Sequence, residues 1–251
     1  MNKNIIIPED NNNSTHGSRI KRMTGGTNTT IDHAPYLVSL ELNNYHHCVG
    51  GIINKNWVIT AGHCIKESKK LYKIRAGSSI TLSGGSLHTI KNIVVHPNYF
   101  KDIKGRCHND IALISVNKEF KFDKSCLPLK FCSYHNLFAN IFGMVSAYKG
   151  VTENSMPRNL KYLYLKTVTK AQCDNYYKAL SGISENQFCA FSALPDSDTC
   201  YGDSGSPFII NNCLMGIVSW GIGCAGPKIP GVYTEVKPYR SWIDQVMTTY
   251  Y

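Results

Sequence analysis

The 251-residue sequence lacks several features that would assign it to other protein classes. No apolar run approaches the roughly 18 residues that a membrane-spanning helix needs, so we expect no membrane partner. No two cysteines have the C-x-x-C spacing typical of zinc sites, which argues against structural zinc. No solenoid-type repeat is visible, and nothing matches a nucleic-acid-binding fold. The segment Leu71–Leu87 contains no Asp or Glu to bind calcium, and we expect no cofactor.

Acidic residues are scarce: 17 Asp and Glu stand against 27 Lys and Arg, a formal net charge of +10. Two stretches are rich in cations, with Lys66, Lys69, Lys70, Lys73 and Arg75 in the first and Lys101, Lys104 and Arg106 in the second. A positive surface attracts anionic partners. A solvated basic face without any partner explains the same pattern and is the interpretation we favour, but an anionic partner at these basic loops stays open.

Ten cysteines are many for a chain of this length. Disulfides persist in oxidising compartments, so scattered cysteines in this number predict a secreted, extracellular, disulfide-bonded protein. The sequence does not begin like a secretory signal, because the apolar stretch Ile5-Ile6-Ile7 is followed at once by Pro8-Glu9. We expect that a signal peptide was removed or replaced by an initiator methionine.

Short β-rich runs broken by Gly, Pro and Asn dominate the chain after residue 22. Such runs with frequent turns predict an all-β sandwich or barrel. We expect one irregular helix near residues 170–179, and apolar spacing of three and four residues predicts an amphipathic helix over about 237–249. Residues 1–22 are polar, Asn-rich and without periodicity, so we expect a disordered pro-segment there.

Three short motifs carry side chains suited to nucleophilic catalysis. They are Thr60-Ala61-Gly62-His63-Cys64, Asn109-Asp110-Ile111-Ala112-Leu113 and Gly202-Asp203-Ser204-Gly205-Ser206-Pro207. A serine hydroxyl is a weak nucleophile at neutral pH, and an adjacent imidazole can accept its proton during attack. A buried carboxylate on the other ring nitrogen fixes the tautomer of that imidazole. A lone His or Asp is more often structural, but the three motifs together favour a catalytic site.

In this order, His63, Asp110 and then Ser204, the motifs resemble those of the chymotrypsin–trypsin family of serine proteases. The resemblance covers nearly all of residues 23–251 and includes arthropod members such as the mite group 3 allergen proteases and their inactivated relatives. Three further stretches agree: His96-Pro97-Asn98-Tyr99, Val218-Ser219-Trp220-Gly221 and Pro230-Gly231-Val232-Tyr233-Thr234. The resemblance implies a monomer with two perpendicular six-stranded antiparallel β-barrels, about residues 23–127 and 128–251. It also implies a C-terminal α-helix and an active site between the barrels.

The resemblance also implies a catalytic role for individual residues. Ser204 would be the nucleophile, His63 the general base and Asp110 the residue that orients His63. The backbone N–H groups of Gly202 and Ser204 would form the oxyanion hole.

Substrate-binding residues follow from the same resemblance. Asp198, six residues before Ser204, would form the floor of a specificity pocket that accepts Arg or Lys, because a buried carboxylate needs a cationic partner. Gly221 and Gly231 would line the wall of this pocket. Ser219 and Trp220, together with Gly221, would pair with the substrate backbone as an added strand.

The basic residues before residue 23 are interpreted as an activation site. By resemblance, another protease would cut after Arg22, and the new ammonium group of Met23 would pair with Asp203 and shape the oxyanion hole. A cut after Arg19 would leave three extra residues and should not activate the enzyme. An unprocessed basic linker is the simpler explanation of these residues, but we favour activation.

Three disulfide pairs are implied by the resemblance, namely Cys48–Cys64, Cys173–Cys189 and Cys200–Cys224. Cys213 is left with either Cys126 or Cys132 as its partner. Cys107, three residues before Asp110 on the cleft side, has no expected partner.

Three departures from the family pattern bear on activity. Tyr201 lies at the pocket rim, where Gln is common; Met23-Thr24 replaces Ile-Val; and Gly143-Met144-Val145 replaces Gly-Trp-Gly. They favour an alternative, a protease-fold binding protein with weak or no catalysis in which Tyr201 occludes the pocket. The intact motif residues and Asp198 favour a secreted zymogen of a trypsin-like serine endopeptidase that cleaves after Arg or Lys through an acyl-enzyme, and this is our prediction.

Overall fold

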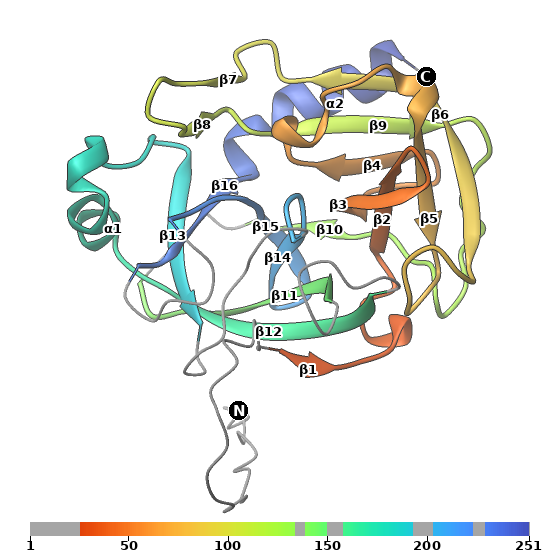
Figure 1. The fold of residues 1–251 in the computed structure, drawn as a ribbon, viewed down its shortest axis with the longest axis horizontal. Coiled ribbons are helices and arrows are strands. Elements are labelled where there is room, and N and C mark those ends of the chain that lie inside the picture. The colour runs from red at the N-terminus through yellow and green to blue at the C-terminus, as the bar shows by residue number, and fades with distance from the viewer. Residues whose placement is uncertain (1–25, 134–138, 150–157, 193–202, 223–228, 251) are drawn as a thin grey trace, which may run out of the picture.

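In the computed structural model, the described residues are 26–133, 139–149, 158–192, 203–222 and 229–250. They form two closed six-stranded antiparallel barrels with few helices (Figure 1), which confirms the predicted all-β fold. None of the helices in these segments is long and apolar enough to cross a membrane.

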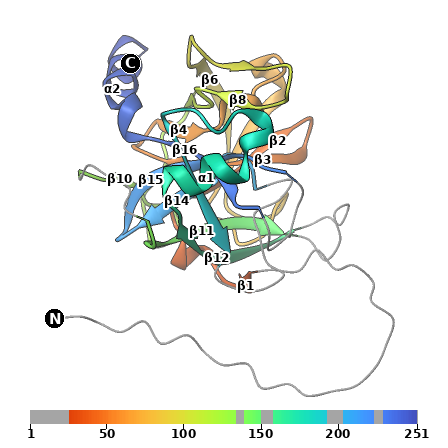
Figure 2. The same ribbon diagram turned by 90° about the vertical axis from the view of Figure 1, so that its left-hand side faces the viewer.

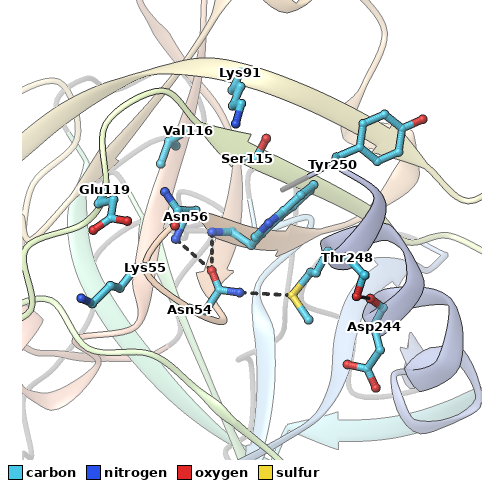
Figure 3. Close-up of a pocket in the computed structure, with 12 residues that line it drawn as sticks. Asn54, Lys55, Asn56, Lys91, Ser115, Val116, Glu119, Asp244, Thr248 and Tyr250 are labelled. Atoms are coloured by element: carbon cyan, nitrogen blue, oxygen red, sulfur yellow. Dashed lines mark hydrogen bonds between the residues drawn. The ribbon is translucent and has the colours of Figure 1, made fainter.

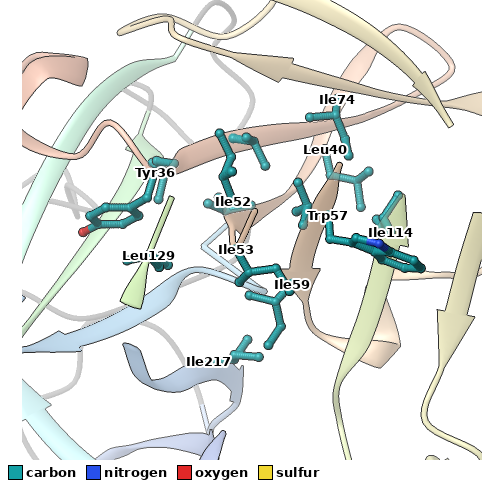
Figure 4. Close-up of a cluster of buried hydrophobic side chains, with 14 of the residues drawn as sticks. Tyr36, Leu40, Ile52, Ile53, Trp57, Ile59, Ile74, Ile114, Leu129 and Ile217 are labelled. Carbon is teal, nitrogen blue, oxygen red and sulfur yellow. The ribbon is translucent and has the colours of Figure 1, made fainter. Parts of the chain in front are cut away.

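The first barrel closes in the order β2-β3-β4-β9-β6-β5. Its strands are β2 (Leu37–Leu42), β3 (Tyr45–Ile52), β4 (Trp57–Thr60), β5 (Tyr72–Ala76), β6 (Ser86–Val95) and β9 (Ala112–Val116). In β5 the residues Tyr72, Ile74 and Ala76 are buried while the two between them are half-buried, as the two-residue period of a strand requires. Figure 4 shows the barrel interior, where Ile217 of the second barrel belongs to the same buried cluster as Ile59. The two barrels therefore share one core.

The second barrel has the order β12-β11-β14-β15-β16-β13 and closes through the pairing of β12 with β13. Its strands are β11 (Phe142–Lys149), β12 (Asn159–Thr167), β13 (Gln187–Ser192), β14 (Pro207–Ile210), β15 (Cys213–Trp220) and β16 (Gly231–Glu235). Its centre is aromatic, with the rings of Phe188, Phe208 and Tyr233 at centroid separations of 5.1–5.2 Å. Such edge-to-face and stacked pairs add to the stabilisation that comes from buried area.

Short elements complete the fold. They are β1 (Thr27–Asn28), β7 (Phe100–Lys101), β8 (Cys107–His108), β10 (Lys130–Phe131) and the 3-10 turns Ile31–His33, Gly62–Cys64, Lys69–Leu71, Lys178–Leu180 and Lys237–Tyr239. Helix α1 (Lys170–Tyr176) begins with a capping box between Thr169 and Gln172 and is followed by a 3-10 turn, so the predicted irregular helix is present. Helix α2 (Arg240–Thr249) follows another 3-10 turn and is the predicted C-terminal helix.

Each end of the described chain packs on the barrel that is distant in sequence. Strand β1 pairs with β12 of the second barrel. Helix α2 buries Ile243 and Val246 in the core that the two barrels share, and its Met247 Sδ accepts a hydrogen bond of 3.2 Å from Asn54, between β3 and β4 of the first barrel. Figures 1 and 2 both show β1 beside β12 and α2 at the opposite side of the molecule, next to the first barrel. These contacts hold the two barrels in a fixed arrangement, and the motif residues lie where the barrels meet.

Candidate active site

Asp110 lies between β8 and β9, and its side chain is fully buried. The backbone N–H of His63 donates to Oδ1 at 2.8 Å, and His63 Nδ1 donates to Oδ2 at 2.8 Å. Ser219 Oγ also donates to Oδ2, and Thr234 Oγ1 donates to the Asp110 carbonyl at 3.1 Å. A buried carboxylate is stable only when donors satisfy it, and here both barrels supply them. The carboxylate therefore holds the His63 ring in one orientation.

His63 lies in the 3-10 turn that follows β4, with its side chain 20 % exposed. The Cys48–Cys64 disulfide ties this turn to β3, and Tyr72 donates from its hydroxyl to the Cys64 carbonyl at 3.1 Å. A Cβ on Gly62 would lie 3.1 Å from the Tyr99 ring and 3.3 Å from Asp110 Oδ1. Glycine at this position therefore lets the turn approach the carboxylate closely.

Ser204 lies in a turn between Asp203 and β14, packed against the first barrel. Val49 N–H donates to the Ser204 carbonyl at 2.8 Å. Gly205 has φ +83°, and a Cβ there would lie 2.2 Å from both Thr60 Oγ1 and the Val49 carbonyl oxygen. Because Thr60 is three residues before His63, this close approach sets the serine turn beside the segment that carries the imidazole.

The remaining predicted residues fall into two groups. Among those described, Asp203 is buried, and its carbonyl accepts from Ser206 N–H at 2.9 Å. Ser219 and Trp220 end β15, and a Cβ on Gly221 would lie 3.8 Å from the Gly231 Cα, so the two glycines are neighbours. Asp198, Tyr201, Gly202, Arg22, Met23 and the pair Cys200–Cys224 lie outside the described residues.

The Gly143 segment is part of a strand. Gly143, Met144 and Val145 belong to β11 and pair with β12. A Cβ on Gly143 would lie 2.1 Å from the Phe208 ring, so this glycine is covered by an aromatic side chain of the barrel core.

The cysteines form two of the pairs that the resemblance implies, Cys48–Cys64 and Cys173–Cys189. Of the two open alternatives for Cys213, the structure contains Cys132–Cys213. Cys107 and Cys126 are free and buried. Burial raises the pKa of each thiol to about 11, so both are protonated at neutral pH and react slowly as nucleophiles.

Sequence reasoning missed three side-chain roles near Asp110. The resemblance assigns Ser219 only to pairing with the substrate backbone and gives Thr234 no individual role, and nothing in a strand pattern tells which hydroxyl meets a carboxylate. The third is Cys107: its thiol, a ring nitrogen of His63 and a carboxylate oxygen of Asp110 all lie within 4.8 Å of one another. Its closeness to Asp110 in sequence was the only available signal.

The β7–β8 hairpin joins the first barrel to the second. Asp102 accepts from Arg106 Nε at 2.7 Å and from His108 Nε2 at 3.1 Å. Burial opposes ionisation of Asp102, but hydrogen bonds from His108 and Arg106 hold its pKa below the usual range. Arg106 Nη1 donates to the Gly182 carbonyl at 3.0 Å, and Gln187 Nε2 donates to the Cys107 carbonyl at 2.8 Å. The hairpin is thus fixed beside Asp110.

A hollow of about 700 Å³ lies between β4, β9 and α2 and contains none of the motif residues (Figure 3). It is lined by neutral polar groups, by the apolar side chains of Trp57, Val116 and Met247, and by four charged side chains, those of Lys55, Lys91, Glu119 and Asp244. The Asn54 side chain in its floor is satisfied, since it accepts from Asn56 N–H and donates to Met247 Sδ at 3.2 Å. This hollow supplies no catalytic constellation.

Comparison with known proteins agrees with this geometry. The family model described as Trypsin matches residues 23–243. Trypsin 5G1 of Aedes aegypti is 32% identical over 228 residues, covering 90% of this chain and 85% of that protein. Trypsin delta of Drosophila melanogaster is 34% identical over 227 residues, covering 88% and 87%.

Among solved structures, mouse neuropsin, a serine protease expressed in the limbic system of the brain, superposes with a TM-score of 0.79 at 26% identity. The match covers 88% of this chain and 98% of that one. The fold shared with this structure and the extent of the sequence matches indicate the same family. The chain belongs to the trypsin family of serine proteases.

Proposed function

We propose that this chain is the zymogen of a secreted serine endopeptidase that cleaves protein and peptide substrates after Arg or Lys through an acyl-enzyme. One observation carries the proposal: His63 Nδ1 donates to the fully buried Asp110 carboxylate at 2.8 Å, in the turn beside which the Ser204 segment packs. The three disulfides support secretion, because such bonds persist in oxidising compartments.

In the proposed mechanism, Asp110 keeps the proton on Nδ1, so the Nε2 lone pair of His63 can accept the Ser204 proton. Ser204 Oγ then attacks the scissile carbonyl, and the N–H groups of Gly202 and Ser204 bind the resulting oxyanion. Collapse breaks the C–N bond, and His63 gives its proton to the leaving amine. Water, deprotonated by His63, next attacks the acyl-enzyme and releases the acid product together with free Ser204.

The proposed specificity rests on Asp198 and on two neighbouring glycines. A carboxylate at the pocket floor would pair with the cation of an Arg or Lys side chain. Gly221 and Gly231 lie next to each other, and the absence of side chains on both leaves room for a long substrate side chain. Two of the relatives carry the name trypsin, which supports the same preference.

Activation would begin with cleavage after Arg22 by another protease. The new ammonium group of Met23 would pair with Asp203, whose side chain is buried directly before Ser204. The salt bridge would fix the backbone of the residues that form the oxyanion hole.

The test is active-site titration of the full chain before and after cleavage at Arg22, with diisopropyl fluorophosphate as the serine-directed reagent. We expect stoichiometric labelling of Ser204 only after cleavage, and no labelling in Ser204→Ala or in the uncleavable Arg22→Gln chain. Hydrolysis of Arg and Lys esters should exceed that of Leu and Phe esters. A folded, cleaved chain that takes no label would instead be a protease-fold binding protein with Tyr201 over its pocket.

A further inference from the structure

Two free thiols occur in the part of the chain that the structure describes, and they differ in their surroundings. Cys126 lies in the hydrophobic core that the two barrels share. Cys107 lies on β8, and its thiol is close to the Tyr99 hydroxyl. It also belongs to a cluster of potential metal ligands with His63 and Asp110. The proposed reaction assigns no role to this thiol.

The ligand atoms of this cluster all lie within 4.8 Å of one another. With zinc–ligand bonds of roughly 2.0–2.3 Å, the ligand atoms of a tetrahedral site lie closer to one another than that limit. A small inward movement of the three side chains would therefore bring their ligand atoms within bonding distance of one zinc ion. The backbone around Cys107 is held, because its carbonyl accepts from Gln187 Nε2 at 2.8 Å and its strand pairs with Lys101. The His63 side chain is 20 % exposed and gives an ion a route from solvent.

We propose that Cys107, His63 and Asp110 form an inhibitory site for a zinc-type divalent cation, with water as the fourth ligand. A thiolate, an imidazole and a carboxylate are the donor set that zinc accepts and that calcium and magnesium do not. Binding at His63 Nδ1 would release the Cys107 proton to solvent, move the His63 proton from Nδ1 to Nε2, and replace the hydrogen bond of His63 with Asp110. The second group of close donors, Cys48, His63 and Cys64, is no alternative because its two sulfurs form a disulfide.

The consequence for activity rests on the proposed function. An ion on a His63 ring nitrogen would use a lone pair of the imidazole, and an ion on Asp110 would remove the acceptor that orients the ring. Either change leaves Ser204 without a working base. The site would therefore make turnover sensitive to free zinc without any change at the substrate pocket.

Metal binding is measured first without any need for turnover. The full chain carrying Ser204→Ala is titrated with Co²⁺, and the sulfur-to-cobalt absorption band is recorded in the near ultraviolet. We expect one equivalent of Co²⁺, displaced by Zn²⁺. The band should disappear when Cys107→Ser is added and remain when Cys126→Ser, the matched free-thiol control, is added. Adding His63→Asn instead should weaken Co²⁺ affinity by at least about tenfold.

Persistence of the band in Cys107→Ser, or its absence in the Ser204→Ala chain, would overturn the metal site. In the cleaved enzyme, Zn²⁺ should inhibit hydrolysis of an Arg ester, and EDTA should reverse the inhibition. Cys107→Ser should raise the inhibition constant at least about tenfold, and Cys126→Ser should not. If no variant hydrolyses the ester, the proposed function fails while the cobalt titration still decides the metal site.

Discussion

Ser219 of the second barrel donates a hydrogen bond of 2.5 Å to Oδ2 of Asp110. Asp110 lies between the β7–β8 hairpin and strand β9 of the first barrel, and it binds His63 through the same oxygen. The residue that orients the imidazole is thus itself positioned from both barrels. Correct packing of the barrels against each other becomes a condition for a correctly oriented His63.

Ser219→Ala removes one donor from a buried carboxylate. A hydrogen bond to a charged group contributes about 1.5–3 kcal/mol, so we expect kcat/KM to fall about 10- to 100-fold. The loss should lie in kcat, since the Ser219 hydroxyl contacts Asp110 rather than substrate. Steady-state kinetics on an Arg ester measure this. Ser219→Thr, which keeps a hydroxyl, should recover part of the rate, and Ser133→Ala on the surface should change nothing. An unchanged kcat in Ser219→Ala would contradict the argument.

Gly205 tests whether the serine turn depends on its close approach to the first barrel. In Gly205→Ala the new methyl would meet Thr60 Oγ1 and the Val49 carbonyl at 2.2 Å, at a φ of +83°. Left-handed backbone costs alanine about 1–2 kcal/mol, and overpacking adds about 1–3 kcal/mol. We expect the free energy of unfolding to fall by about 2–5 kcal/mol and ester hydrolysis to be lost.

The matched control is Gly105→Ala in the β7–β8 hairpin. Its φ is +82°, but among the described residues the nearest atom to an added Cβ would be Lys101 Cε at 3.8 Å, so only backbone strain applies. Chemical denaturation should therefore show a loss of only about 1–2 kcal/mol. Equal losses for the two variants would mean that the contact at Gly205 is unimportant.

Three histidines have a pKa lowered by burial, and from this we predict that the free energy of unfolding decreases at acidic pH. Burial lowers the pKa of His47, His88 and His96. The unfolded chain therefore takes up protons before the folded chain does as pH falls below about 6.5. Stability is full above that pH and decreases below it, by at most about 1.4 kcal/mol per pH unit for each additional proton bound by the unfolded chain.

His88 is the member of this group to change, since it lies away from the motif residues. It is buried on β6, with Ser86 Oγ and the Lys118 carbonyl each 2.8 Å from one of its ring nitrogens. His88→Gln keeps polar atoms in the site but does not titrate. Urea denaturation from pH 7.5 to 5 should show a shallower decrease for this variant than for the wild-type chain. A parallel decrease would assign the pH dependence to other groups.

Much of the fold could be predicted from the sequence because the strand pattern and the motif resemblance agree. Tyr72, Ile74 and Ala76 alternate with polar residues, and Thr169 with Gln172 forms a local capping box. What could not be predicted depends on distant partners. The Ser219 hydroxyl reaches Asp110 across 109 positions, and Cys107 meets His63 only because β8 ends beside the 3-10 turn. Cys213 likewise had two candidate partners until the three-dimensional arrangement selected Cys132.

Gly221 offers a test of the proposed specificity pocket that leaves the fold unchanged. Among the described residues, the nearest atoms to a Cβ there would be Gly231 Cα at 3.8 Å and the Tyr177 hydroxyl at 3.9 Å, which is ordinary van der Waals contact. Gly221→Val should therefore alter the thermal midpoint by less than about 2 °C. Because the isopropyl group would occupy the wall of the proposed pocket, KM for Arg and Lys esters should rise at least about tenfold, equivalent to about 1.4 kcal/mol of lost binding. An ester of a small residue such as Ala should lose much less. If Arg, Lys and Ala esters were affected equally, Gly221 would not line the pocket that selects the substrate side chain.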